Sequence, residues 1–235
     1  MKRTHLFFLV LTLGCLTTNA QAGSITGLAK FDGDAPGLKP IKMDADPICM
    51  AKHSDPMLPQ VIVLGPNKEM AYVFVRVIGG LPKKAFPAPT TEAVVDQNGC
   101  MYEPHVIGVQ VGQPVKILNP DGTLHNVHAM PKVNEEFNMA MPKFRTEVSK
   151  TFTKPEFMFP MKCDVHPWMQ AWISVMEHPF FSTTGADGKY SINDLPAGEY
   201  ELEAWHEKLG TQTAKVTLGE GETKEVNFTF AKPAK

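Results

Sequence analysis

A seven-residue segment in the second half of the chain, residues 163–169, carries three side chains that could bind a metal ion. Cys163, His166 and Met169 follow one another at intervals of three residues, and the flanking sequence predicts that they share one tight loop. Thiolate, imidazole and thioether are the donors that suit copper cycling between Cu(I) and Cu(II), with the thioether as a weak axial ligand. A second imidazole would complete a trigonal site of two histidines and one cysteine, and His125 can supply it.

The second imidazole has to come from a distant part of the fold. Residues 125–128 contain two histidines, His125 and His128, whose side chains would point to opposite faces of a strand because they are three residues apart. Only one of them is expected to face the metal. Fast electron exchange requires nearly one geometry in both oxidation states, and Pro167 restricts the motion of the loop. These residues predict one type 1 copper ion and a protein that carries single electrons.

The first 22 residues have the pattern of an export signal. A positive start at Lys2 and Arg3 is followed by an apolar run over residues 6–16 and a small-x-small cleavage site ending at Ala22. The run is too short to cross a bilayer, which indicates a signal peptide cleaved after Ala22 and no transmembrane helix in the mature chain. Lipid anchoring at Cys15 is the less favoured reading. We therefore predict a periplasmic or secreted protein.

Charge and motifs exclude several classes of function. Loss of Lys2 and Arg3 with the signal changes the formal net charge from −2 to −4, and no basic patch suggests a nucleic-acid partner. The serine-hydrolase elbow, the His-Glu-x2-His zinc motif and the phosphate-binding loop are absent from the sequence. We therefore expect no enzyme. The expected partners are a redox donor and acceptor, for example a c-type cytochrome or a periplasmic dehydrogenase, that associate transiently.

The mature chain keeps three cysteines, which is an odd number for an exported protein. A disulfide between Cys49 and Cys100 is the default in an oxidising compartment and would stabilise the fold by roughly 2–4 kcal/mol. Cys163 is then left unpaired. Metal ligation explains such a thiol well.

The distribution of turn residues predicts an all-β chain. Twenty prolines and eighteen glycines favour many short strands over long helices. Three blocks follow the signal: N-terminal strands over 24–89, the copper block over 92–177 and a C-terminal block over 179–231. Apolar and alternating segments predict strands over 25–31, 61–64, 71–77, 93–96, 107–111, 115–119, 148–152, 171–175, 213–218 and 225–230.

The copper block resembles a known family. Paired strands over 106–119 that end in an asparagine, the segment His125-Asn126-Val127-His128 and the loop 163–169 are similar to the amicyanin- and plastocyanin-like cupredoxins, the type 1 blue copper proteins. The resemblance covers about residues 94–176 and implies a Greek-key β-sandwich or barrel with copper at one end. It also implies the ligands and their supports, which are His125, Cys163, His166 and axial Met169, with Asn126 and Pro167 bracing them.

The C-terminal block resembles a second family. The segment from Asp187 to Leu202, with its Asp-Gly-Lys-Tyr and Leu-Pro-x-Gly-x-Tyr motifs, is similar to the carboxypeptidase regulatory-like, transthyretin-type β-sandwich. This resemblance implies a second, smaller sandwich that acts as a binding or spacer module without chemistry of its own. The strands of block 24–89 would complete it, so the copper block would be inserted into, or stitched beside, a sandwich built from both ends of the chain.

Several alternatives remain open at this stage. Met139, Met141, Met158 and Met161 could bind Cu(I) as thioethers, which keeps a periplasmic copper carrier or storage protein as an alternative, although core packing is the simpler role. A structural or binding surface module is the second alternative. His178 and His206 could belong to a second metal site. For electron transfer, we expect the docking face around Pro167 and Trp168, where an imidazole edge would offer the shortest path outward.

Overall fold

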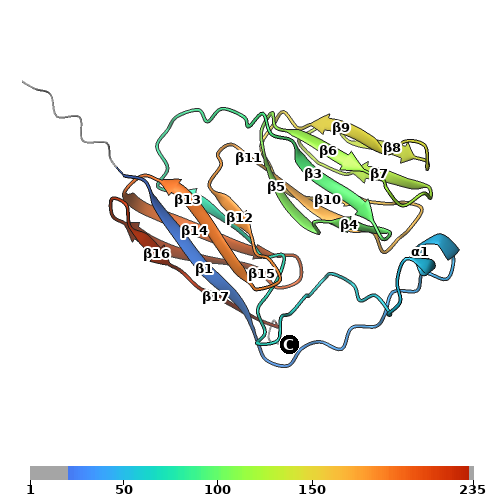
Figure 1. Cartoon of the computed structure of the whole chain (residues 1–235). Helices are drawn as coiled ribbons and strands as arrows, with labels where there is room; N and C mark the ends of the chain where they lie inside the picture. The colour runs from blue at the N-terminus through green and yellow to red at the C-terminus, as the bar shows by residue number, and fades with distance from the viewer. Residues whose placement is uncertain (1–20, 233–235) are drawn as a thin grey trace, which may run out of the picture.

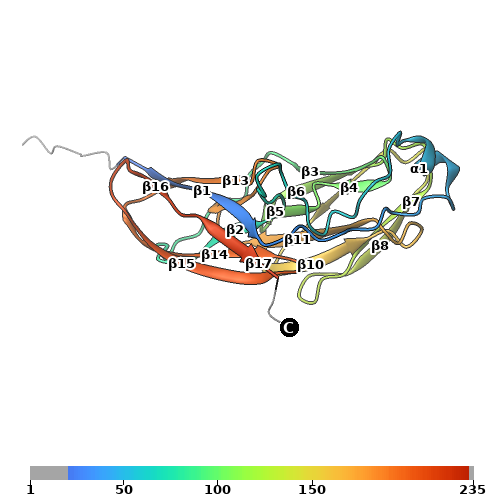
Figure 2. The same cartoon turned by 90° about the horizontal axis from the view of Figure 1, so that it is seen from below.

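The computed structural model describes residues 21–232, and it is an all-β fold, as the sequence predicts. The described residues form seventeen strands and one short helix, arranged as two β-sandwiches that lie end to end (Figures 1 and 2). Residues 1–20 of the expected signal peptide, with Cys15, fall outside the described residues; Gln21 and Ala22, which precede the expected cleavage point, are described and come directly before β1. In the described part of the chain, no helix is long and apolar enough to cross a membrane.

The smaller sandwich is built from both ends of the chain. One of its sheets has the order β13-β1-β16, with β17 also paired to β1, and the other has the order β12-β2-β14-β15. Its strands are β1 (Gly23–Asp32), β2 (Phe74–Gly79), β12 (Phe181–Thr183), β13 (Lys189–Leu195), β14 (Gly198–His206), β15 (Gly210–Leu218), β16 (Thr223–Glu225) and β17 (Phe228–Ala231).

Strand β1 shows why the N-terminus belongs to this sandwich. Its side chains alternate between the core and the surface, so that Ile25, Ala29 and Phe31 are buried. The strand pairs in parallel with β16 and β17 at the other end of the chain. The two ends of the sequence thus share one sheet and one core.

The larger sandwich is inserted between β2 and β12. One sheet has the order β5-β11-β10-β7-β8 and the other the order β4-β3-β6-β9. The strands are β3 (Ala93–Asn98), β4 (Met101–Glu103), β5 (Val106–Gln110), β6 (Pro114–Leu118), β7 (His125–Ala129), β8 (Phe137–Met141), β9 (Glu147–Thr151), β10 (Glu156–Lys162) and β11 (Gln170–Met176). Buried aliphatic and aromatic residues such as Val95, Ile117, Val127, Phe159 and Ile173 form its core.

A third cluster of apolar side chains joins the two sandwiches. Phe74 of β2, Val106 of β5 and Met176 of β11 are buried together in it. Gly108 allows the close approach, because a Cβ atom there would lie 2.5 Å from the ring of Phe181. The guanidinium of Arg76 also lies 3.5 Å from the centre of the Phe157 ring. Apolar packing therefore connects the two sandwiches.

Residues 41–57, which we call the α1 segment, leave the smaller sandwich and pack against the larger one. The segment contains helix α1 (Pro47–Ala51), drawn at the far end of the molecule in Figure 1. Met43 and Cys49 are buried in the core of the larger sandwich. The block 24–89 thus contributes β1 and β2 to one sandwich and the α1 segment to the other.

The expected strand over 61–64 does not form. These residues make turns, and Leu64 alone joins Met70 in an isolated bridge. Pro59 and Pro66 flank the run, and a proline has no backbone N–H with which to extend a ladder.

Candidate metal centre

The structure brings together the three strongest donors predicted from the sequence. His125 begins β7, while Cys163 and His166 lie in the loop between β10 and β11, and all three are buried. One donor atom of each lies within 4.8 Å of the others. The Nδ1 atoms of His125 and His166 are 2.9 Å apart, and the Cys163 Sγ atom lies 3.8 Å from Nδ1 of His166.

Strand β7 orients its two histidines to opposite sides. His125 is fully buried, whereas the imidazole of His128 is partly exposed. The Nδ1 atom of His128 is 3.1 Å from Asp164 and its Nε2 atom is 3.0 Å from Glu136. Only His125 therefore faces the candidate site, as the alternation of side chains along a strand requires.

The loop that carries Cys163 closes on itself. The Cys163 N–H donates to the carbonyl of Met169 at 3.1 Å, and the Met169 N–H donates to the carbonyl of His166 at 2.9 Å. The side chain of Met169 is 1% exposed and packs in the core of the larger sandwich. Trp168 fixes the other side of the loop, because its indole N–H donates to the carbonyl of Cys100 at 3.0 Å.

Asn126 braces the same loop from β7. Its Oδ1 atom accepts the backbone N–H groups of Asp164 at 2.6 Å and Val165 at 3.3 Å. Its Nδ2 group donates to Asn138 at 2.7 Å. One side chain thus ties the residue after Cys163 to the strand that carries His125.

A carboxylate contacts the outer nitrogen of each histidine. The Nε2 atom of His125 lies 2.9 Å from Asp121, and the Nε2 atom of His166 lies 3.0 Å from Asp46. The sequence analysis did not single out either aspartate. Asp121 lies in an Asn-Pro-Asp-Gly sequence typical of turns, and Asp46 precedes a proline, which is the pattern of a helix N-cap. Both patterns point to structural roles.

The electrostatics of the site favour a thiolate beside the two rings. Burial opposes ionisation of Cys163, but His125 and the backbone N–H groups of Asn126, His166 and Val165 lower the pKa of the thiol. Burial also opposes the charged form of His125, yet Asp121 and Cys163 raise the pKa of that ring. For His166, burial prevails and lowers the pKa. A metal ion binds the thiolate form of cysteine, so a lowered pKa of Cys163 favours metal binding.

Cys49 and Cys100 form a disulfide, with an S–S distance of 2.04 Å, and Cys163 is free. The disulfide lies beside the candidate site, because Cys49 Sγ is 3.6 Å from Nε2 of His166. Two further groups of metal-type ligands, Asp46-Cys49-His166 and Cys100-Asp121-His125, reuse these cysteines and the outer faces of the two rings. With both sulfurs in a disulfide, neither group offers a thiolate.

The expected exposed imidazole edge is absent. His166 is 2% exposed, because Asp46 and Cys49 of the α1 segment cover its outer nitrogen. The docking face expected around Pro167 and Trp168 therefore does not present this ring to solvent. No local pattern predicts that a segment more than a hundred residues away covers the loop.

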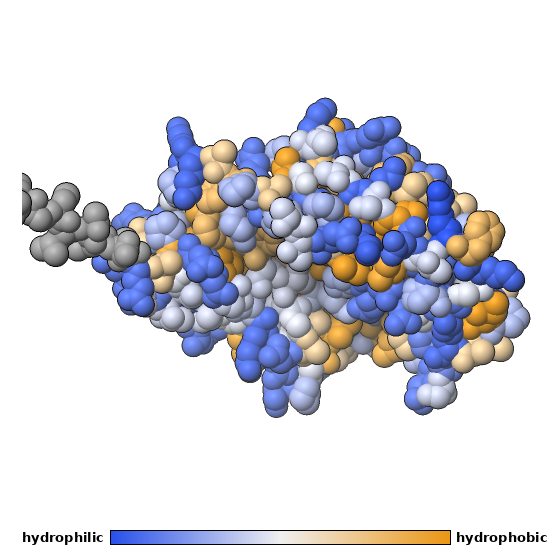
Figure 3. Space-filling view, turned by 45° about the horizontal axis from the view of Figure 1, so that its top comes forward, coloured by the Kyte–Doolittle hydropathy of each residue, from blue (hydrophilic) through white to orange (hydrophobic). Residues whose placement is uncertain are grey.

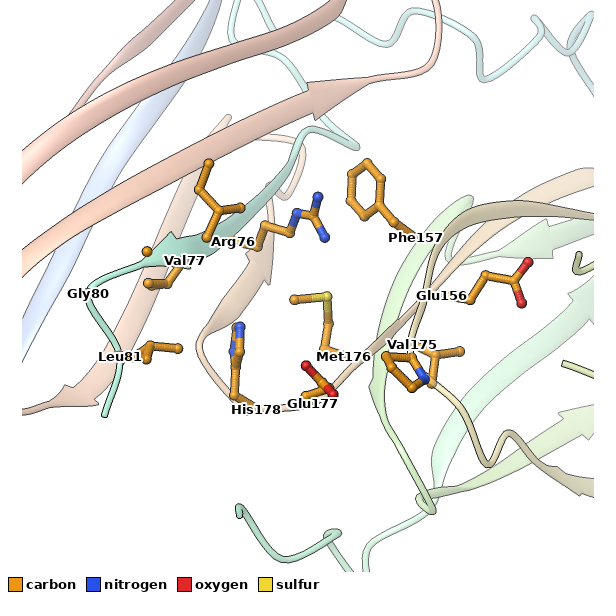
Figure 4. A pocket seen from close by; sticks show the side chains of 13 residues that line it. Arg76, Val77, Gly80, Leu81, Glu156, Phe157, Val175, Met176, Glu177 and His178 are labelled. Carbon is orange, nitrogen blue, oxygen red and sulfur yellow. The ribbon is translucent and has the colours of Figure 1, made fainter. Parts of the chain in front are cut away.

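The other candidate ligands occupy core, junction and pocket positions. Met141 and Met161 are fully buried core residues, and Met158 packs where the two sandwiches meet. None of the groups of metal-type ligands found among residues 21–232 includes His178 or His206. His178 lines a pocket with Arg76 and Glu177 (Figure 4), where its Nδ1 atom accepts the N–H of Phe180 at 3.2 Å.

The surface offers no single large apolar face in the view of Figure 3, where polar side chains cover most of the molecule and apolar ones show between them. Exposed apolar side chains do occur near the candidate centre, including Ile48 and Met50 of α1 and Val165 of the loop. Single exposed apolar residues of this kind are common on protein surfaces.

The residues present fit a copper ion. A free thiol and two imidazoles converge with nitrogen atoms facing each other, and the other nitrogen of each ring contacts a carboxylate that can only accept a hydrogen bond. The rings are therefore oriented with Nδ1 toward the thiol. Two imidazoles and a thiolate are the trigonal donor set of blue-copper sites, which add a weak, long axial ligand.

The larger sandwich gathers the donors that the resemblance to cupredoxins implies, and the smaller sandwich contains the segment that resembles the carboxypeptidase regulatory-like domain. The family model of the carboxypeptidase regulatory-like domain matches residues 170–231, which confirms that resemblance and extends it back to β11. No curated protein sequence matches the chain.

Solved structures similar to this chain include amicyanin variants, a purple cupredoxin and a copper-containing nitrite reductase. A reduced amicyanin variant is 28% identical, with a TM-score of 0.33, and the match covers 43% of this chain and 98% of that one. A purple cupredoxin from Nitrosopumilus maritimus is 18% identical, with a TM-score of 0.30, over 36% of this chain and 99% of that one.

A copper-containing nitrite reductase from Thermus scotoductus SA-01 is 23% identical, with a TM-score of 0.32. That match covers 43% of this chain but only 26% of the reductase, so this chain spans about a quarter of the length of that enzyme.

Proposed function

We propose that this chain is an exported type 1 copper protein that carries single electrons between redox partners and transforms no substrate. The observation that supports this proposal most strongly is the convergence of a free, buried Cys163 with the Nδ1 atoms of His125 and His166. A cysteine left unpaired beside an intact disulfide needs a role, and metal ligation supplies one.

The proposed ligands of one copper ion are His125, Cys163, His166 and Met169. A bound copper ion would supply one-electron chemistry between Cu(I) and Cu(II). The chain's own residues hold the donors in place: Asn126 ties the loop to β7, and the Cys163–Met169 hydrogen bond closes it. Burial of all three strong donors excludes water from the site. A rigid, dry site changes little on oxidation, which suits electron transfer.

The rest of the chain is assigned supporting roles. The copper domain is proposed to span residues 92–177 together with the α1 segment, which packs on its core. The smaller sandwich, from the remainder of block 24–89 and from 179–231, would be a spacer or binding module. We propose a periplasmic or secreted location and transient partners such as a c-type cytochrome or a periplasmic dehydrogenase.

A copper carrier or storage protein is a second candidate, and one observation favours it. The outer nitrogen of His166 is covered, so the ring that would pass electrons to a partner is closed off instead of exposed. A covered site suits retention of copper. In that role the protein would bind copper tightly and exchange electrons slowly.

The test uses the mature protein purified with and without added copper salt. Electron transfer predicts one copper per chain and an intense visible thiolate-to-copper band that bleaches reversibly with mild reductant and vanishes in Cys163→Ala. Copper carriage predicts tight Cu(I) binding that survives Cys163→Ala. A folded protein with no defined copper stoichiometry would contradict both functions and favour a structural module.

A further inference from the structure

Asp46 makes two different sets of contacts at once. Its Oδ1 atom accepts the N–H groups of Ile48 at 2.8 Å and Cys49 at 3.3 Å, which caps the N-terminus of α1. Its Oδ2 atom lies 3.0 Å from Nε2 of His166 and accepts the hydroxyl of Thr123 at 3.1 Å. The helix cap therefore fixes the carboxylate that holds the histidine.

The α1 segment also reaches the second histidine, through Asp121. The Oδ2 atom of Asp121 lies 2.9 Å from Nε2 of His125, and its Oδ1 atom pairs with the ammonium group of Lys52 at 2.8 Å. Lys52 is the C-cap residue of α1. One short helix thus contributes to the support of both imidazoles, directly at one end and through a salt bridge at the other.

Covalent and polar contacts fix this segment to the larger sandwich. Cys49 is bonded to Cys100, and the ring of His53 lies 2.7 Å from the carbonyl of Gly99. A backbone hydrogen bond of 2.8 Å from Ile41 to Met57 closes the base of the segment. These contacts hold the α1 segment in place over the outer nitrogen of His166.

The two carboxylates determine which nitrogen each ring turns inward. A carboxylate accepts hydrogen bonds and does not donate them, so Nε2 of each ring carries the proton that Asp46 or Asp121 accepts. In a neutral imidazole the other nitrogen, Nδ1, is then a lone-pair donor. That atom faces Cys163, which is the orientation a metal ligand needs.

We propose that the α1 segment is a built-in cap of the copper centre, in which Asp46 positions His166 as a ligand and closes its ring off from solvent and partner proteins. The inference rests on the proposed copper site. An electron that leaves through His166 then has to cross the α1 segment, because Asp46 and Cys49 are the groups at its outer nitrogen.

The test compares Asp46→Ser with Asp44→Ser in the mature chain. Serine is a good N-cap, so the first variant keeps the helix but removes the carboxylate from His166. Asp44 is exposed in the same segment, so its replacement makes the same change of charge without touching the site. Asp46→Asn, which keeps the size of the side chain, is the second variant should Asp46→Ser fail to fold by circular dichroism.

The first readout needs no copper. In the metal-free protein, the rate at which diethyl pyrocarbonate labels His166, mapped by peptide mass spectrometry, should rise about tenfold in Asp46→Ser and stay unchanged in Asp44→Ser. A labelling rate equal to that of the unmodified protein in a folded Asp46→Ser variant would overturn the cap.

The second readout uses the copper-loaded protein. Loss of a carboxylate that makes a ligand imidazole more basic should weaken copper binding about 10- to 100-fold and shift the reduction potential upward. Unchanged affinity and potential in a folded Asp46→Ser variant would overturn the positioning role. If the unmodified protein binds no copper, the proposed function is wrong, whereas the labelling of His166 still decides whether Asp46 closes the ring off.

Discussion

The Nδ1 atoms of His125 and His166 lie 2.9 Å apart, and each ring is held from behind by its own aspartate. Two lone pairs that face each other at this distance repel, unless a proton or a metal ion lies between them. The stability of the site should therefore depend on whether a proton or a metal ion lies between the two rings.

Removal of copper should lower the stability of the protein. A ligand that binds only the folded state at about a hundredfold excess over its Kd adds about 2.7 kcal/mol. Thermal unfolding with copper and after chelation should show this difference in Cys163-containing protein. The difference should disappear in Cys163→Ala. Equal melting temperatures for the loaded and chelated forms would contradict a copper site made by these residues.

Asn126→Ala should destabilise the fold and loosen the metal-binding loop. The substitution leaves the backbone N–H groups of Asp164 and Val165 without their acceptor, which costs about 1–3 kcal/mol. Chemical denaturation of the metal-free protein measures this cost. Asn98→Ala, at an exposed position on β3, is the matched control and should change the unfolding free energy by less than about 0.5 kcal/mol. A similar change in both variants would argue against the bracing role.

Replacing both Cys49 and Cys100 by alanine should cost stability without removing the metal site. Closing a long loop by a disulfide contributes about 2–4 kcal/mol, which urea titration of the double variant should show as a loss. Copper should still bind with the same stoichiometry, because its proposed ligands lie on β7 and the 163–169 loop. Loss of stoichiometric copper in the folded double variant would place the disulfide among the requirements of the site.

His206 should make the smaller sandwich sensitive to acid. Burial lowers the pKa of His206 from 6.5 to about 4, so the unfolded chain binds a proton in this interval that the folded chain does not. The free energy of unfolding is therefore unaffected by this ring above pH 6.5. It decreases as the pH falls toward 4, by at most about 3 kcal/mol. His206→Gln should flatten this part of the stability curve; an unchanged slope would show that the ring titrates normally.

His128 should show the opposite dependence on pH. Glu136 and Asp164 raise the pKa of this partly exposed ring above 6.5. A raised pKa means that its stabilising contribution is complete below pH 6.5 and is lost as the pH rises through the folded value. The destabilisation caused by His128→Gln, measured by urea unfolding, should therefore be larger at about pH 5.5 than at about pH 8.5. Equal destabilisation at the two pH values would mean that neither carboxylate interacts with the charged ring of His128.

The four proposed donors could be chosen from local sequence patterns, because three of them lie within one loop. Cys163, His166 and Met169 are close in sequence, and His125 stands at the start of a strand. The two supporting carboxylates could not be predicted from local patterns, because Asp46 contacts a ring that is 120 positions away in the sequence. Contacts between such distant residues depend on the whole fold, which local periodicity does not encode.

Strands, like the site residues, could be predicted where a local pattern is present. Those with clear alternation or apolar runs, such as β1, β6 and β11, form where the sequence predicts them. Strand β10 has no polar–apolar alternation in its sequence. The strand itself is irregular, because Met158 has a positive φ of 48° and the pairing with β11 shifts between Glu156 and Phe159. Helix α1 is only five residues long and contains a proline, so its position follows from its contacts with the larger sandwich more than from helical propensity.

The position of the disulfide beside the candidate centre makes the order of maturation important. Cys49, Cys100 and Cys163 come together at one corner of the larger sandwich, so oxidation in the wrong pairing would consume Cys163. A chain whose Cys163 thiolate already binds copper has only the correct pair left to oxidise. The bond that then forms shuts the metal in behind it, so arrival of copper before oxidation would both protect the ligand and trap the ion.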